Sequence, residues 1–478
     1  MSIIDKKTIT KQAEDFAQWY QDVVREAELA EPSEVRGCGI VRPYGLKIWE
    51  LIKEELNRRL EADGVQNVYF PIFVPLENLE AEKNHIEGFS PELAIVTIGG
   101  GEELTNKLAV RPTSEAAMYK TYARWIQSYK DLPLRLNQWA NVVRWEKRPR
   151  AFLRWSEFLW QEGHTVFANE EEARAEMKKM LGIYQDIYEY LAIPVFAGEK
   201  SVSEKFAGAE TTLSAEIMAR DGRAIQGATS HYLGTNFAKV FGVNYLGSDG
   251  QTYLGHQNSW GLSWRSVGAL IMVHGDDNGL RLPPNIAPLQ IVIVPIYRDA
   301  ASQEAVLNFC QKIEKSLKNK YRLKIDDREA QTPGFKFNYW EVRGVPVRLE
   351  IGLKEVSAGQ ITVFRRDDNT KETVSINQLN IRLNRLMKEI HKNLYRQAHT
   401  LAASKIYRIK SWEEIDDRQG WFEASWSEDP ATEKQLKERF SMVSRVLLPK
   451  SAVRGPRQKK CFISGQPAKH DWLFAKSY

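Results

Sequence analysis

A polar face on two neighbouring strand-like segments between Arg111 and Phe167 constrains this 478-residue chain more than any other feature. The first segment ends in Asn141-Val142-Val143-Arg144-Trp145-Glu146, and the second runs from Phe152 to Phe167. Both are rich in Val, Phe, Trp and Leu, with proline and basic residues between them, which predicts two strands joined by a loop. Because side chains alternate across a strand, Arg144 and Glu146 share a face, and one face of the second strand carries Arg154, Ser156, Trp160, Glu162 and His164.

Such a face is either solvated or the floor of a polar site. A single Arg–Glu pair would fit the solvated face of an antiparallel sheet. Two arginines, two carboxylates, a tryptophan and a histidine in one place favour a site, since buried charges are costly unless they are paired or bind a ligand. Guanidinium groups bind phosphate or carboxylate bidentately, so we expect an anionic ligand.

Three strings in this region resemble motifs of one enzyme family. Thr113-Ser114-Glu115, Val142-Val143-Arg144-Trp145-Glu146 and Trp160-Gln161-Glu162-Gly163-His164 look like those of prolyl-tRNA synthetases of the archaeal/eukaryotic-like type, which are class II aminoacyl-tRNA synthetases. Two later strings fit the same family, Ala224–His231 and Asn258–Arg265, although the first of them taken alone could be a turn. The resemblance covers nearly the whole chain and weakens after about Lys405.

The resemblance implies an α+β protein of three domains. These are a class II antiparallel-sheet catalytic domain at 1–286, an α/β anticodon-binding domain at 287–400 and a small α+β domain at 401–478 that keeps the framework of a zinc site. The residues agree for the second domain, where an apolar run at 289–294 and strand candidates at 321–325, 347–351 and 361–364 alternate with helical patterns. Helices are also expected at 8–30, at 377–404 and at 169–191, the last with an inward stripe of Met177, Met180, Leu181, Ile183 and Tyr184. A helix at 46–62 and a proline-interrupted strand at 68–74 resemble the signature that forms the dimer interface of class II enzymes. A homodimer is therefore expected, although core packing explains this pattern equally well.

Composition narrows the cellular setting. Lys plus Arg number 67 against 62 Asp plus Glu, a weakly basic balance that is compatible with an RNA partner but does not demonstrate one. Three widely spaced cysteines argue against a disulfide framework and fit a reducing cytosol. Early charges such as Asp5 and Lys6 exclude a signal-peptide core, and no apolar run reaches membrane-spanning length, so we expect a cytoplasmic protein without a membrane partner.

The function that the resemblance implies is that of a proline–tRNA ligase, which forms prolyl-adenylate from proline and ATP and transfers proline to tRNA(Pro). Arg144 would hold the α-phosphate and the carboxylate, and Arg154 and Arg265 would hold the remaining phosphates, with Mg²⁺ bridging their oxygens. Small residues around Arg265 admit a ligand, and guanidinium suits phosphate. Further ATP-site residues would be Gln226 and Thr229, with Glu146 and Glu157 steadying either the guanidiniums or the ion; their spacing does not decide which.

The proline pocket is assigned in the same way. The imino group of proline is a cation with two donors, and Thr113 and Glu115 resemble the residues that accept from it. Trp160 and His164 would wall the ring, Glu162 would orient the pocket, and two further residues would lie near the amino acid, His231 and Ser263. In the anticodon-binding domain the candidates for reading bases are Glu341, Arg343, Arg348 and Lys354. A solvated, charged strand end explains each of these four about as well.

Two further expectations concern what the chain lacks. Only about 95 residues separate His164 from Ser259, which leaves no room for the large editing domain that bacterial-type enzymes carry there. In the last domain, where relatives have zinc-binding cysteines, this chain has Ser427, Ser444 and Ser464, and only Cys461 remains. Because a structural zinc site needs four thiolate or imidazole ligands, no structural zinc is expected.

Three alternative functions are weighed against this one. A tRNA-independent adenylating paralogue is disfavoured by the intact region 287–400. A non-enzymatic tRNA-binding relative is disfavoured by the joint presence of Arg144, Arg154, Arg265, Gln226 and Thr229. Another class II amino-acid specificity is disfavoured by the Thr-Ser-Glu and Trp-Gln-Glu-Gly-His strings.

Overall fold

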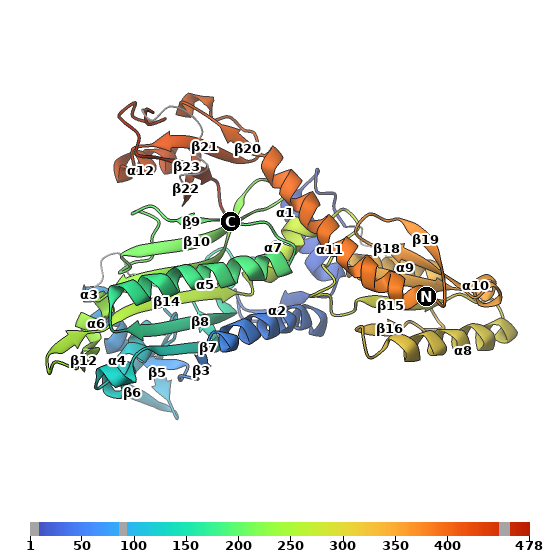
Figure 1. Ribbon diagram of the computed structural model, residues 1–478, viewed down its shortest axis with the longest axis horizontal. Helices are drawn as coiled ribbons and strands as arrows, with labels where there is room; N and C mark the ends of the chain where they lie inside the picture. The colour runs from blue at the N-terminus through green and yellow to red at the C-terminus, as the bar shows by residue number, and fades with distance from the viewer. Residues whose placement is uncertain (1–8, 86–92, 449–458) are drawn as a thin grey trace.

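A seven-stranded sheet forms the centre of the molecule, which a computed structural model describes at residues 9–85, 93–448 and 459–478 (Figure 1). Its strands follow the order β3-β7-β8-β14-β11-β10-β9, and all neighbours are antiparallel except β3 and β7. Their bounds are β3 Gln66–Asn67, β7 Leu134–Val143, β8 Glu157–Phe167, β14 His256–Ser263, β11 Ala224–Gly234, β10 Thr211–Met218 and β9 Phe196–Glu199. The antiparallel sheet that the resemblance implies for the first domain is therefore present.

Three helices bury one face of this sheet. They are α2 (Pro43–Ala62), α5 (Glu170–Tyr190) and α7 (Arg265–His274), and α5 runs along the sheet in Figure 1. The predicted inward stripe of α5 is buried at Met177, Met180, Leu181 and Tyr184, while Ile183 packs partly buried against the core. With this face filled, only the opposite face of the central strands is available for a ligand.

The N-terminal region differs from its prediction in its boundaries. A helix expected at 8–30 is limited to α1, Phe16–Glu26, because the Asp15 side chain accepts from the N–H groups of Ala17 and Gln18 and so caps the helix there. The strand expected at 68–74 is reduced to the start of β4 (Phe73–Pro75), while β3 ends at Asn67, before the predicted range; the two strands belong to different sheets. Pro71 lies between them and has no N–H to continue a ladder.

Strands β7 and β8 are shorter than predicted where they meet. The first ends at Val143 and the second begins at Glu157, so Arg144, Glu146, Arg154 and Ser156 lie in the connecting loop rather than on strand faces. The loop is ordered by the Arg144 N–H, which donates to the Ser156 carbonyl at 2.8 Å, and by a left-handed residue, Phe152, with φ of 57°. Alternation therefore fails for these four residues and holds for Trp160, Glu162 and His164.

The second domain contains a five-stranded sheet of order β16-β15-β17-β18-β19. Strand β15 is parallel to both of its neighbours, and the last two pairs are antiparallel. The strand predicted at Val347–Ile351 is confirmed as β17, and the others shift by one or two residues. The elements are β15 Ile291–Pro295, β16 Leu323–Ile325, β18 Gln360–Arg365, β19 Lys371–Ser375, α8 Ala300–Leu317, α9 Pro333–Val342 and α10 Leu353–Ala358.

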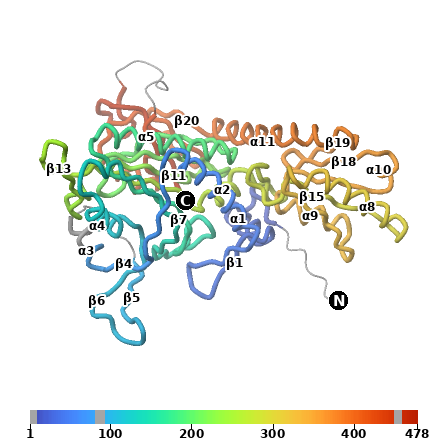
Figure 2. The backbone as a smooth tube through the Cα atoms, turned by 60° about the horizontal axis from the view of Figure 1, so that its bottom comes forward, coloured from blue at the N-terminus to red at the C-terminus, as the bar shows by residue number. Residues whose placement is uncertain are grey.

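Helix α11 (Leu379–Ser404) carries the chain from this domain back across the molecule to the third domain (Figures 1 and 2). A four-stranded sheet of order β20-β21-β23-β22 forms the third domain and lies against strands β9 and β10 of the central sheet. Its elements are β20 Ile406–Arg408, a 3₁₀ turn Trp412–Glu414, β21 Trp421–Trp426, α12 Pro430–Phe440, β22 Val443–Leu447 and β23 His470–Ala475.

The remaining elements border the open face of the central sheet. They include a three-stranded sheet, β4-β6-β5, and two hairpins, β1-β2 and β12-β13, none of which is part of the central sheet. Within the described residues, every helix is too short or too polar to cross a membrane. The elements not yet placed are β1 Ala30–Pro32, β2 Gly39–Val41, α3 Leu76–His85, β5 Ile95–Gly99, β6 Glu102–Val110, α4 Glu115–Trp125, a 3₁₀ turn Tyr129–Asp131, α6 Asn236–Phe241, β12 Asn244–Leu246 and β13 Thr252–Leu254.

Candidate active site

A cavity of about 280 Å³ opens on the free face of the central sheet. Alternation along β8 points Phe158, Trp160, Glu162 and His164 into it, and β14 and β11 form the rest of its floor. Every predicted proline or ATP residue lines this cavity except Arg154, Glu146 and Glu157. The lining residues that were predicted are Thr113, Glu115, Arg144, Trp160, Glu162, His164, Gln226, Thr229, His231, Ser263 and Arg265.

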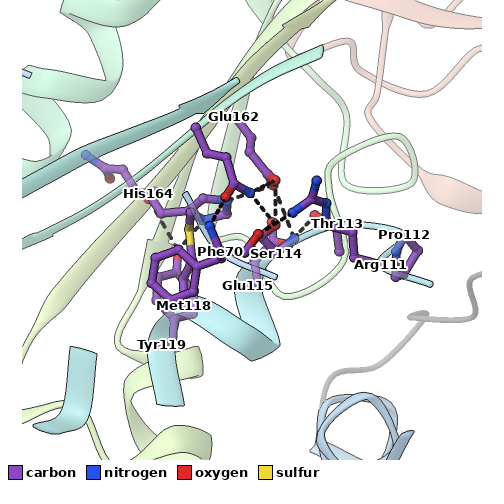
Figure 3. Close-up of polar contacts among 12 residues, drawn as sticks. Phe70, Arg111, Pro112, Thr113, Ser114, Glu115, Met118, Tyr119, Glu162 and His164 are labelled. Atoms are coloured by element: carbon purple, nitrogen blue, oxygen red, sulfur yellow. Dashed lines mark hydrogen bonds and ion pairs between the residues drawn. The ribbon is translucent and has the colours of Figure 1, made fainter. Parts of the chain in front are cut away.

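Glu162 is the centre of the acidic end of the cavity (Figure 3). Its carboxylate accepts from the Ser114 hydroxyl at 2.5 Å and from the Ser114 N–H at 3.1 Å. Gln138 Nε2 donates to it at 3.0 Å, and His164 Nε2 lies 3.1 Å away. Burial alone would raise its pKa, but these partners outweigh burial and lower the pKa of Glu162. The carboxylate is therefore charged at neutral pH, fixed in orientation and saturated with donors.

Glu115 is the second carboxylate at this end. It is the first residue of α4, where the positive end of the helix dipole favours a negative charge, and it is 3% exposed. The Thr113 hydroxyl donates to it in a short hydrogen bond. The turn before α4 is held by Arg111, which is buried and donates to the carbonyls of Phe70 at 2.7 Å and Asn141 at 2.8 Å. Unlike Glu162, Glu115 keeps acceptor capacity for a ligand.

Two histidines face the cavity, and their pKa values are shifted in opposite directions. Burial opposes protonation of His164, but its hydrogen bond to Glu162 and the nearby Glu115 charge outweigh burial and raise its pKa. Burial lowers the pKa of His231 to about 3, with His164 adding to the effect. His231 is hydrogen-bonded through Nδ1 to the Thr212 hydroxyl at 2.9 Å and packs on the Phe206 ring. His231 is therefore neutral at neutral pH, whereas the carboxylates beside His164 favour its protonated form.

Glu115, Glu162 and His164 also lie close enough together to share a metal ion. The donor set fits one poorly, because Glu162 already accepts four hydrogen bonds and the raised pKa of His164 favours a protonated ring, which cannot ligate. A small organic cation that donates hydrogen bonds fits better. It needs acceptors and a negative potential, both of which Glu115 and Thr113 supply.

Arg144 and Arg265 form the cationic end. Arg144 donates through Nε to the Pro112 carbonyl at 2.9 Å and lies over the Trp160 ring at 5.1 Å. Arg265 donates to the carbonyls of Leu153 and Gln226 at 3.2 and 3.4 Å. Burial, Arg144 and Arg154 together lower the pKa of Arg265. Within the described part of the chain neither Arg144 nor Arg265 has a carboxylate partner at ion-pair distance, so together they attract a polyanion.

Three predicted ATP residues lie outside the cavity wall. Arg154 is half-exposed and lies 3.8 Å from Glu146, so Glu146 steadies a guanidinium in this structure. Glu157 is exposed and accepts from Asn141 Nδ2 at 2.8 Å. All three lie on or beside the loop that covers the cationic end.

The candidates for reading the anticodon are not brought together as a surface. Arg348 is buried between Phe337 and Phe364 and pairs with Glu350 and Glu341. Arg343 is 4% exposed, stacks on Tyr339 and pairs with Glu28 of the catalytic domain. Lys354 is exposed and Glu341 is half-buried.

Phe206, Thr212 and Ser259 are among the cavity residues that the sequence prediction missed. Phe206 and Thr212 support His231, and alternation in β10 was the available signal for Thr212. Ser259 lies opposite both His164 and His231 in the sheet, and its buried hydroxyl has no partner among the described residues. It belongs to the Asn258–Arg265 string, from which only Ser263 and Arg265 were chosen.

The framework expected in the third domain is only partly assembled. Ser427 donates to the Cys461 thiol at 3.4 Å, while Ser444 instead contacts Ser201 and Glu433 at the contact with the catalytic domain. Ser444 therefore does not belong with Cys461, a correction to the predicted set. Helix α12 lies between Ser427 and Ser444 in the chain, and Ser444 is on β22, which packs against the catalytic domain.

Comparison with known proteins identifies three matching family models along the chain. Residues 97–274 match the tRNA synthetase class II core domain (G, H, P, S and T), residues 290–386 an anticodon binding domain, and residues 411–478 the prolyl-tRNA synthetase C-terminal domain. The chain is 45% identical to a proline–tRNA ligase of Natranaerobius thermophilus, over 99% of this chain and 98% of that protein. It is 46% identical to a proline–tRNA ligase of Symbiobacterium thermophilum, with the same coverage. A crystal structure of prolyl-tRNA synthetase from Cryptosporidium parvum, complexed with halofuginone and AMPPNP, superposes with a TM-score of 0.95 at 40% identity, covering 98% of this chain and 99% of that one.

Proposed function

Because the chain belongs to the prolyl-tRNA synthetase family of class II aminoacyl-tRNA synthetases, we propose that proline and ATP react in the cavity between β8, β14 and β11. The enzyme is an ATP-dependent, proline-specific ligase. A proline carboxylate oxygen attacks the α-phosphorus of ATP and pyrophosphate leaves. The 3′ hydroxyl of the tRNA then attacks the prolyl carbonyl and AMP leaves. One observation carries the assignment of the cavity: an acceptor-rich acidic end and an unpaired cationic end face one another across it.

Proline binds at the acidic end. Its imino cation donates one hydrogen to Glu115 and one to Thr113, which remain able to accept. Glu162 is saturated, so it acts by holding Ser114 and His164 in place and by its charge. The ring lies among Trp160, His164 and the neutral His231, with Ser263 at the edge, because these side chains wall the same end.

ATP binds at the cationic end. Arg144 is placed to contact both the proline carboxylate and the α-phosphate, while Arg265 contacts a terminal phosphate at the N-terminus of α7, where helix N–H groups also favour an anion. Gln226 and Thr229 border the nucleotide. Arg154, steadied by Glu146, reaches the phosphates from the covering loop, and Mg²⁺ accompanies ATP as part of that substrate. Glu157 lies beside the same loop, at the start of β8.

The test is pyrophosphate exchange by the purified full-length protein, followed by charging of tRNA(Pro). Exchange should depend on proline. Exchange with a different amino acid and none with proline would refute the assignment, as would proline-dependent exchange that survives intact in both Arg144→Ala and Arg265→Ala.

We further propose that the enzyme is of the archaeal/eukaryotic-like type. Helix α5, strands β9 to β13 and helix α6 fill the interval between His164 and Ser259, which contains no separate domain, and the third domain follows the anticodon-binding one. The proposed domain limits are 1–286, 287–400 and 401–478. The boundary between the second and third domains lies inside α11.

A homodimer is proposed on the exposed apolar side chains that gather near the predicted dimer signature, Tyr69, Phe73, Ile95, Ile98 and Trp125. We propose a cytoplasmic location because the three cysteines are all free thiols and the substrate is tRNA. Measuring the molecular mass of the protein in solution tests the homodimer.

For tRNA binding, Lys354 is the one of the four anticodon candidates that is exposed and basic. Base reading by Glu341, Arg343 and Arg348 would require these side chains to leave their present partners. We also propose that the third domain folds without zinc, because packing of Trp426 against Trp472 and of Phe462 against Phe474 supplies a core.

A further inference from the structure

The third domain packs closely against the catalytic sheet along one seam. Strand β22 lies against β9 and β10, and a Cβ atom added at Gly198 in β9 would come within 2.5 Å of the Leu447 carbonyl. An apolar cluster crosses the seam, containing Met218 and Ala224 from one side and Trp421, Val446 and Leu473 from the other. Such contact makes the two domains one packed unit at this point.

A buried charge cluster lies in the same seam. Glu216 of β10 is 0% exposed, and its carboxylate lies 2.9 Å from Lys200 Nζ and 2.9 Å from Nε of Arg445, which belongs to β22. Ser214 donates to it at 2.5 Å. Burial would raise the pKa of Glu216, but the two cations outweigh burial and lower it. The third domain thus supplies half of the charge that keeps this carboxylate ionised inside the protein.

Such a cluster needs an explanation other than stability. Replacing a buried ion pair by apolar groups of similar volume is often neutral or stabilising, because desolvation cancels most of the attraction. The apolar cluster beside it already holds the seam. What the charges add is a fixed geometry at one point of β10.

That point is a β-bulge that faces the active site. Ala215 pairs with Ala228, and the next residue, Glu216, pairs with Gln226, so Gly227 is the extra residue on β11. Gln226 and Gly227 both line the reaction cavity, and the Gln226 carbonyl accepts from Arg265. Bulges next to active sites re-aim side chains. A second cavity of about 160 Å³ lies between Arg265 and Arg445, with Gln226 in its wall.

We propose that Arg445 is a positioning residue for adenylation: through Glu216 it fixes the β10–β11 bulge that presents Gln226 and Arg265 to ATP. The proposal rests on the assignment of ATP to the cationic end. It gives the third domain a part in the first chemical step, separate from any part in tRNA binding. Because proline binds at the opposite end of the cavity, the effect falls on ATP and leaves proline binding unchanged.

The test compares variants in proline-dependent pyrophosphate exchange, with ATP and proline titrated separately. Arg445→Met should raise KM for ATP at least fivefold and lower kcat/KM for ATP at least tenfold, with KM for proline within twofold of wild type. Arg445→Lys keeps the charge and should recover most of the loss. Glu216→Gln approaches the same contact from the catalytic side, and adding it to Arg445→Met should cost less than the product of the two single effects.

The matched control is Ser444→Ala, on the same strand and in the same seam. Ser444 contacts Ser201 and Glu433, which lie outside the bulge, so this variant should stay within twofold of wild type for both substrates. If Arg445 served only to dock the domain, Ser444→Ala would weaken exchange in the same manner, and KM for ATP and KM for proline would change together.

The outcomes separate the two levels of inference. Absence of proline-dependent exchange by the wild-type protein overturns the proposed function itself. An active wild type with an unchanged KM for ATP in Arg445→Met overturns only the positioning role. Should Arg445→Met fail to fold, Glu216→Gln and Arg445→Lys decide: a KM for ATP raised in the first and near wild type in the second supports the role, and an unchanged value in the first overturns it.

Discussion

Replacing Arg265 by methionine should separate stability from catalysis. The change keeps most of the side-chain length and removes the charge. Arg265 is the first residue of α7, where the positive end of the helix dipole disfavours a cation by about 0.3–1 kcal/mol. Burial and the neighbouring Arg144 act in the same direction, since both lower the pKa of Arg265. In the free enzyme the guanidinium is therefore held at a cost.

The rate of pyrophosphate exchange, by contrast, should fall in this variant. The proposed role of Arg265 is to meet a phosphate of ATP, and removing one preorganised charge-stabilising donor costs about 2.7–4 kcal/mol in the transition state. We therefore expect pyrophosphate exchange to fall by roughly 10²–10³-fold, while the free energy of unfolding stays equal to that of wild type or rises by up to about 1 kcal/mol.

The measurements are proline-dependent exchange, urea unfolding of the free protein, and the shift in Tm on adding ATP with Mg²⁺. ATP should raise the Tm of the wild type and have little effect on the variant. Arg58→Ala removes an exposed arginine paired with Glu55 and serves as control, with both properties near wild type. A variant that loses several kcal/mol of stability yet keeps exchange would show that Arg265 holds the fold and not the nucleotide.

Three other expectations follow from the same structure. Gly163→Ala should destabilise the protein by about 1–3 kcal/mol in urea unfolding, because its Cβ would lie 2.2 Å from the Trp260 ring, which is buried in the core beneath the cavity floor. The strain should shift β8 and β14 and so raise KM for proline; an unchanged KM would contradict this. Alanine should support exchange with kcat/KM lower than proline by about 10–200-fold, and the mischarged tRNA should persist; rapid hydrolysis by this protein alone would contradict it. A chelator should leave the Tm unchanged, since Cys461 contacts Ser427 and not a second thiol; bound zinc, lost in Cys461→Ser, would contradict it.

Much of the fold follows from local sequence pattern. Strand β17 coincides with its prediction, and α5 and α11 differ from theirs by one or two residues, because each carries a continuous apolar run or stripe. Within β8 the two-residue period also selects the correct face, so Trp160, Glu162 and His164 all reach the cavity.

The pattern fails where long-range contacts decide the backbone. Arg144 and Arg154 were expected on strand faces, but the loop that carries them is shaped by the left-handed Phe152 and by the contact of Ser156 with the carbonyl of Gly37. That contact joins residues more than a hundred positions apart, which no local periodicity encodes. In the same way, Arg343 is buried against Glu28 of a different domain, so its burial could not be predicted from the neighbouring residues in the sequence.

The active site and the domain seam share one physical feature, which is charged groups buried where removing them from water is costly. Glu162 is buried with its lone pairs filled, and Arg265 occupies a helix N-terminus beside another cation. Glu216 is buried in the seam and held ionised by a residue from another domain. A chain selected for stability alone would place apolar groups at such positions. These charges are explained together if each is oriented before the substrates arrive, because preorganised groups need no rearrangement when the developing charge of the transition state appears.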